Sequence, residues 1–110
     1  MSEAALETVS DLISEAHARI QRDFQYIDPL VGLSRGMRTV GIPADLITID
    51  CLKTNRRIIL LLHDDQPETL SYQFSRRDCD PADNFETMPL QEINTQRLYD
   101  WISEYFSRVN

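Results

Sequence analysis

The sequence predicts one α+β domain, a three-stranded antiparallel meander with helices packed on one face, in the order α-α-β-β-β-α. Three observations lead to this prediction. Apolar residues recur at helical spacing near both ends of the chain, three segments between residues 46 and 75 have strand patterns, and short polar connections separate those segments. With 110 residues, the chain has room for one ordinary domain, which we place at 1–110.

The first expected element is a long helix over residues 3–26. Arg19 and Arg22 follow four acidic residues, an order that the helix dipole favours: Glu3, Glu7, Asp11 and Glu15. His17 is expected at the edge of the apolar stripe, on the surface or at an interface. The stripe itself repeats at intervals of three and four residues: Leu6, Val9, Ile13, Ala16 and Ile20.

A second, shorter helix is expected between Asp28 and Gly41. Asp28 is a suitable N-cap, Pro29 a suitable first residue, and Gly41 a suitable residue after the helix end. Gly32 and Gly36 each lower helix stability by about 1 kcal/mol relative to alanine. The apolar residues again repeat at intervals of three and four: Leu30, Leu33, Met37 and Val40.

Three strands follow, at Leu46–Lys53, Arg57–Leu62 and Thr69–Ser75. The first and third alternate apolar and polar residues, and the second is almost wholly apolar, as expected of a central strand. We expect Lys53 to lie opposite Arg56 across a tight turn. One face of the sheet then forms the core with the helices: Ile47, Ile49, Cys51, Ile58, Leu60 and Leu62.

The remaining chain is predicted to form an acidic loop over residues 78–92 and a final helix from about Thr95 to Arg108. Asn94 or Thr95 would cap that helix. Its apolar face is broad and rich in aromatic residues: Leu98, Trp101, Ile102, Tyr105 and Phe106.

The opposite face of the sheet carries apolar residues among polar ones and is a candidate contact patch. These residues are Leu46, Leu52, Ile59 and Leu61. The first helix is also longer than a strand of this sheet, so part of it would overhang. We therefore expect a homodimer built from one of these surfaces. The alternative is that a helix covers the second face within the monomer.

The net charge of −7 and the sequence pI of about 4.6 argue against a protein that binds nucleic acid or an anionic membrane. They favour a basic protein as a second partner, with Asp78, Asp80 and Asp83 of the acidic loop as contacts. The N-terminus lacks the pattern of a signal peptide, and the longest apolar run, Ile58 to Leu62, is too short to span a bilayer. The expected location is the cytoplasm.

Two fragments resemble catalytic motifs. Residues 32–36 match G-x-S-x-G, but Ser34 falls inside the predicted second helix rather than on the strand-to-helix turn that such a nucleophile requires. His63 precedes Asp64, but neighbouring strand residues point to opposite faces and make a poor acid–base pair. We therefore expect no catalytic residues.

Neither a metal nor another cofactor is expected. His17, His63, Cys51 and Cys79 lack zinc-site spacing, and the acidic loop lacks the glycine and glutamate of a calcium loop. Cys51 alternates with isoleucines and is interpreted as a buried apolar residue. Flanking aspartates should make the Cys79 thiol less reactive.

Two arginine pairs are expected at one end of the meander, because the second strand starts where the third one finishes. These are Arg56 with Arg57 and Arg76 with Arg77. Together they could bind an anion or an acidic segment of a partner. The alternative is that they neutralise nearby acids, Asp78 and Asp80 above all.

The sequence therefore favours a small acidic protein-interaction module, such as an adaptor, an inhibitor or immunity-type protein, or a chaperone. The alternative is a small-molecule-binding protein or small enzyme that uses a pocket between the helices and the sheet, with His63 and the arginine pairs. A regulator acting on nucleic acid is least compatible with the negative charge.

Overall fold

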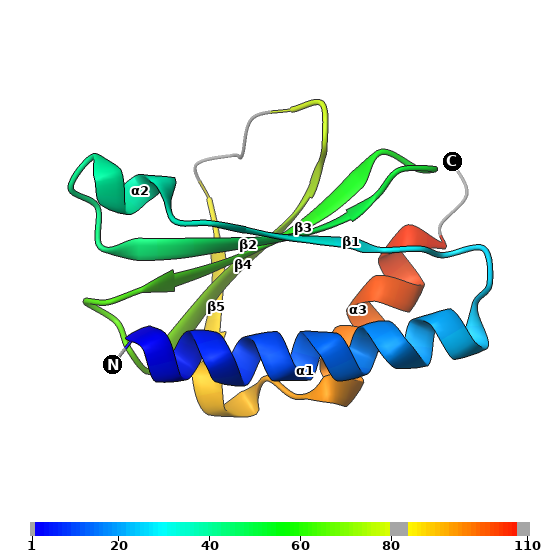
Figure 1. Cartoon of the computed structure of the whole chain (residues 1–110), viewed down its shortest axis with the longest axis horizontal. Coiled ribbons are helices and arrows are strands. Elements are labelled where there is room, and N and C mark those ends of the chain that lie inside the picture. The colour runs from blue at the N-terminus through cyan, green and yellow to red at the C-terminus, as the bar shows by residue number, and fades with distance from the viewer. Residues whose placement is uncertain (1, 80–83, 108–110) are drawn as a thin grey trace.

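The structure is a computed structural model that describes residues 2–79 and 84–107 (Figure 1). Its elements, in chain order, are α1 (Ser2–Asp23), β1 (Leu30–Ser34), α2 (Gly36–Thr39), β2 (Ala44–Cys51), β3 (Arg56–His63), β4 (Thr69–Arg76), β5 (Glu86–Pro89), the 3₁₀ helix η1 (Leu90–Glu92) and α3 (Thr95–Phe106).

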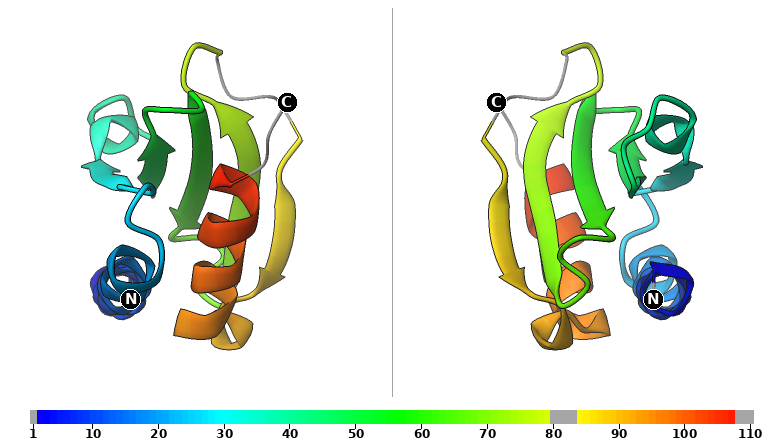
Figure 2. Two further views of the ribbon diagram at one scale, coloured as in Figure 1. Left: turned by 90° about the vertical axis from the view of Figure 1, so that its right-hand side faces the viewer. Right: turned by 90° about the vertical axis from the view of Figure 1, so that its left-hand side faces the viewer.

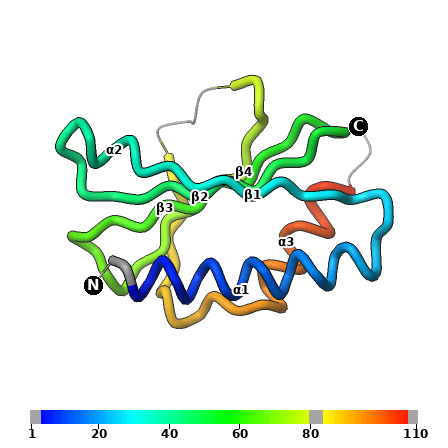
Figure 3. Tube along the Cα trace, viewed as in Figure 1, coloured from blue at the N-terminus to red at the C-terminus, as the bar shows by residue number. Residues whose placement is uncertain are grey.

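The five strands form one antiparallel meander in the order β1-β2-β3-β4-β5. The helices α1 and α3 pack against each other and contribute side chains to one core together with the sheet. Figures 2 and 3 show the twisted sheet, with β1 and β5 at its two edges and α1 running below β1. The buried residues of α1 are the predicted stripe: Leu6, Val9, Ile13, Ala16 and Ile20.

The predicted fold class is wrong in its number of strands and in its order of elements. Residues 30–34 form the strand β1, and only Gly36–Thr39 are helical in the segment expected to be a second helix. Pairing with β2 satisfies the backbone of β1 on one side, which local helical spacing cannot reveal. A Cβ atom at Gly32 would lie 3.0 Å from Thr48 Oγ1, so glycine permits this close approach.

The predicted helix end at Gly41 is confirmed. Gly41 has a φ of 87° and directly follows Val40, the C-cap residue of α2. The backbone N–H of Ile42 donates to the Met37 carbonyl at 2.8 Å, and that of Gly41 donates to the Arg38 carbonyl at 3.3 Å. This pattern is a Schellman motif, which satisfies the last carbonyls of the short helix.

A second correction concerns the loop expected over residues 78–92. Part of it is the edge strand β5, in which Met88 lies opposite Leu70 of β4 and is buried. Pro89 ends this strand at the sheet edge, where the missing N–H of proline is tolerated. The sequence pattern predicts a loop here because proline and acidic residues are both uncommon inside central strands.

The three predicted strands are present as β2, β3 and β4, with one difference in register. Cys51, rather than Lys53, lies opposite Arg56, which shifts the β2–β3 pairing by two residues and lengthens the turn. Asn55 in this turn has a positive φ of 59°. A shift of two residues keeps every side chain on its face, so the predicted core face is correct.

A buried ion-pair cluster fixes α2 to the sheet. Asp45, at the start of β2, is fully buried. Arg38 donates to its carboxylate at 2.8 and 3.1 Å, and Arg35 donates to it at 2.9 Å. Arg38 also donates to Asp64 at 2.8 and 2.9 Å, which ties α2 to the end of β3.

Replacing Asp45 by asparagine should lower the free energy of unfolding by about 3 kcal/mol, because two arginines lose their buried partner. Hydrogen bonds from Arg38 hold the pKa of Asp45 below its ordinary value, against the effect of burial and with help from Arg35. The folded carboxyl thus binds protons less readily than the unfolded one. The stability that it contributes is complete above the unfolded pKa of about 3.9 and is lost as the pH falls below it.

Urea unfolding followed by the fluorescence of Trp101 would measure both effects at neutral and acidic pH. The matched control is Asp78→Asn, since Asp78 is exposed and lies 3.5 Å from Arg76. If both variants unfold at the same urea concentration as the native chain, the cluster does not stabilise the fold.

Candidate functional site

The strand β1 forms one edge of the sheet and pairs with β2 on its inner side. All five residues of Leu30–Ser34, which we call the β1 edge, are exposed. Three of them are large and apolar, with exposed fractions of 46% for Leu30, 49% for Val31 and 54% for Leu33. An apolar strand at this level of exposure is unusual, since proteins generally protect the edges of their sheets.

Each face of the β1 edge carries at least one large apolar side chain. Val31 and Leu33 lie opposite two core isoleucines of β2 and therefore point to the face that carries the helices. Leu30 lies opposite Asp50 and points to the other face. A strand added at this edge would therefore meet a large apolar side chain on each face of the sheet.

The β1 edge is anchored at both ends. His17 of α1 donates from Nε2 to the carbonyl of Pro29 at 2.9 Å, just before the strand. Arg35, just after it, is held by Asp45. These contacts, together with the pairing to β2, fix the strand in an extended form before any partner binds, which lowers the entropic cost of association.

The opposite edge of the sheet is protected in ways that the β1 edge is not. The strand β5 has four residues, a charged residue at Glu86 and a proline at Pro89. Short length, charge and proline all discourage the addition of another strand. The β1 edge has five residues and contains neither charge nor proline.

A groove of about 380 Å³ runs between α1 and the β1 edge. Ser10, Ser14 and His17 line it on the side of α1, and Pro29, Leu30 and Val31 line it on the other side. Ile13 of α1 also lines it, and the groove shares Leu30 and Val31 with the exposed strand, so a partner that binds the strand could also place a side chain in the groove.

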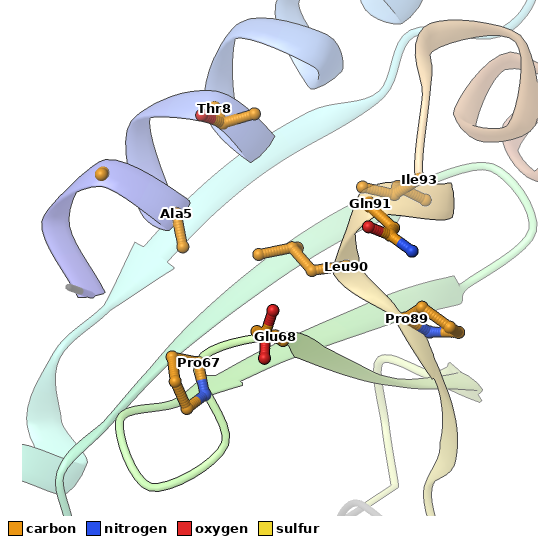
Figure 4. Close-up of a pocket in the computed structure, with 9 residues that line it drawn as sticks. Ala5, Thr8, Pro67, Glu68, Pro89, Leu90, Gln91 and Ile93 are labelled. Atoms are coloured by element: carbon orange, nitrogen blue, oxygen red, sulfur yellow. The ribbon is translucent and has the colours of Figure 1, made fainter.

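A second, larger pocket of about 620 Å³ lies at the other end of α1 (Figure 4). Its walls come from the start of α1, the β3–β4 connection and η1. Among the described residues that line it, Glu68 is the one with a titratable side chain, and the Glu68 carbonyl accepts a hydrogen bond from the Leu90 N–H at 2.8 Å. His63 and the arginine pairs do not line this pocket.

The arginine pairs are brought to one end of the sheet but are divided between its faces. Arg56 lies opposite Arg76 and is buried on the helix side, where it donates to the Tyr105 carbonyl and stands 5.2 Å from the Tyr105 ring centroid. Arg76 is exposed and lies beside Asp78.

Arg57 and Arg77 meet on the opposite face, where both bind Asp50. Arg57 donates at 2.7 and 2.9 Å, and Arg77 donates at 3.2 Å. Burial raises the pKa of Asp50, but the hydrogen bonds and charges of the two arginines outweigh it and hold the pKa below its ordinary value. These guanidinium groups thus neutralise a buried acid of β2, a residue that the sequence analysis did not consider as their partner.

The four residues of the predicted contact patch do not form one exposed surface. Leu46 and Leu61 lie opposite each other and are half-buried, on the face away from the helices. Ile59 lies on the same face but is 1% exposed. Leu52 is 55% exposed in the β2–β3 turn.

Three aspartates of the acidic loop are the predicted contacts for a basic partner. Asp78 is exposed, whereas Asp80 and Asp83 lie outside the described residues.

Ser34 ends β1, and its hydroxyl accepts a weak hydrogen bond from the Gly36 N–H at 3.4 Å. Nδ1 of His63, the last residue of β3, accepts one from the Asp65 N–H at 3.2 Å in the turn that follows the strand.

Comparisons with known proteins add nothing to this description, because no family model, no curated protein and no solved structure matches the chain. Within residues 2–79 and 84–107, no cluster of three or more histidine, cysteine or acidic side chains could hold a metal ion. In the same part of the chain, no helix has both the length and the apolar character needed to cross a bilayer.

The sequence pattern does not reveal the β1 edge, because Leu30 and Leu33 also fit a helical stripe. One usable signal was present. Residues 29–34 are free of charge in a chain with a net charge of −7, and they contain Val31, a residue that favours strands.

Replacing Asp50 by asparagine should create an anion site where the native protein has an internal ion pair. Arg57 and Arg77 would lose their carboxylate, and pyrophosphate could take its place. We expect pyrophosphate to raise the thermal unfolding temperature of Asp50→Asn clearly more than that of the native chain, at matched ionic strength. Asp78→Asn is the control, and an equal response of all three proteins would contradict the idea.

Proposed function

We propose that this chain is a protein-interaction module and that the β1 edge is its contact surface. The observation that carries the proposal is an anchored, uncharged edge strand with apolar side chains exposed on both faces. On its outer side such a strand presents backbone N–H and C=O groups to a partner strand. Addition of a strand would provide affinity through these groups and specificity through the side chains.

The β1 edge supports this proposal better than the patch on the opposite sheet face. Ile59 is buried there, and Leu46 and Leu61 are half-buried, so the patch offers less apolar surface than Leu30, Val31 and Leu33. The acidic charge remains part of the proposal. Exposed Asp78 would favour a basic partner near the far end of β4, but it would act as a supplementary contact.

The proposed location is the cytoplasm, as the sequence predicts. Both cysteines are free in the structure: Cys51 is buried in the core, and Cys79 is exposed. Free thiols are typical of a reducing compartment.

A second candidate function is the binding of a small molecule in the pocket of Figure 4, whose volume is in the range of known ligand sites. The variant Thr8→Tyr separates the two candidates. It would fill part of this pocket and leave the β1 edge unchanged, so it should not affect an interaction that uses β1.

The proposal predicts that Leu33→Lys abolishes partner binding while the fold is kept. Leu33 is more than half exposed, so the substitution costs little stability, but it places a charge within the apolar contact. Affinity capture of the tagged full-length chain from its native cell lysate, with quantified bound protein, would measure the effect.

The matched control is Thr87→Lys, which introduces the same charge at an exposed position of the opposite edge strand. A partner retained by Thr87→Lys and lost by Leu33→Lys supports the proposal. A partner lost equally by both variants, or retained by both, would show that β1 is not the contact surface.

A further inference from the structure

We infer that the occupant of the β1 edge is a second copy of this chain, bound through antiparallel pairing of the two β1 strands about a twofold axis at Gly32. The inference rests on the proposed function and specifies its partner. The two sheets would then form one continuous antiparallel sheet.

The sequence of the strand is suited to pairing with itself. A twofold axis at Gly32 places residues that are equally distant from Gly32 opposite each other. Val31 then lies opposite Leu33 of the second copy, and Leu30 lies opposite Ser34. All five residues of β1 take part, and no charged side chain enters the contact.

The side chains also meet on matching faces. A twofold axis perpendicular to the sheet keeps α1 and α3 of both copies on the same face. Val31 and Leu33, which point to that face and lie outside the core cluster, would form a joint apolar cluster with their counterparts. Val31 lines the groove beside α1, so Leu33 of the second copy would enter that groove.

Charges at the two ends of the strand are complementary under this pairing. Asp28 precedes the strand and is exposed, whereas Arg35 follows it with 42% of its side chain exposed. Antiparallel pairing brings Asp28 of one copy toward Arg35 of the other, twice in the dimer. Two chains of net charge −7 repel each other in general, and the uncharged β1 edge adds no like charges to the contact.

A basic extended peptide is the main competing occupant. Such a peptide needs carboxylates along the strand, and Leu30–Ser34 contains none. The pairing of Val31 with Leu33 on either side of Gly32, and the absence of charge along the strand, fit a copy of the same strand better.

Sedimentation velocity of the full-length chain over a concentration series tests the inference. We expect a dimer for the native protein and for Thr87→Lys. For Leu33→Lys, and for Val31→Lys as a second variant, we expect the dissociation constant to rise by more than about tenfold. Circular dichroism and thermal unfolding would establish that both β1 variants remain folded.

Disulfide trapping tests the register. In a Cys79→Ser background, we expect Val31→Cys mixed with Leu33→Cys to form a cross-linked dimer, because these positions face each other across the axis. Each variant alone should cross-link much less. Rapid cross-linking of Val31→Cys with itself would place the axis elsewhere and overturn the proposed register.

The two proposals can fail separately. If the native chain is a monomer at every concentration but Leu33→Lys still loses a captured partner, the second copy is excluded and the β1 contact surface stands. If a dimer forms and both β1 variants keep it, the dimer uses another surface and the inference is wrong. If neither self-association nor capture depends on β1, both proposals are wrong.

Discussion

The width of the helical layer determines which part of the sheet remains exposed. A helix with its side chains is about 10 Å wide, and neighbouring strands lie about 4.8 Å apart, so two helices side by side cover about four strands. The core cluster accordingly draws side chains from β2 through β5, and β1 contributes none of its described residues. The exposure of Val31 and Leu33 on the helix-bearing face is therefore a consequence of the architecture.

Two buried acids of β2 organise the charged side chains around this sheet. Asp45 binds Arg35 and Arg38, and Asp50 binds Arg57 and Arg77. Four of the basic side chains thus have internal partners, which leaves fewer of them for external anions. Ion pairs of this kind cost desolvation energy, and their main effect here is geometric. Asp45 fixes α2, and with it the end of the β1 edge.

The proposed recognition through an edge strand would also explain why a search for motifs finds no function. Strand addition uses backbone N–H and C=O groups, which every residue except proline provides. Its requirements are exposure, extension and the absence of charge, and Leu30–Ser34 meets all of them. None of these properties needs a particular residue type at a particular spacing, in contrast to a metal centre or a catalytic dyad.

The sequence by itself determined the elements in which apolar residues repeat clearly at helical or at strand spacing. These are α1, α3 and the strands β2 to β4, with their core faces. These depend on local repetition, which the chain carries over many residues. The same reasoning could not decide residues 28–41, because Leu30 and Leu33 fit a helical stripe, while β1 forms through pairing with β2. Alternation along the strand places Arg56 and Arg57 on opposite faces, but their partners, the Tyr105 carbonyl and Asp50, are distant in the sequence and are known only from the structure. The candidate site was decided by tertiary structure, because hydrogen bonds and ion pairs between distant residues determine which strand becomes the edge.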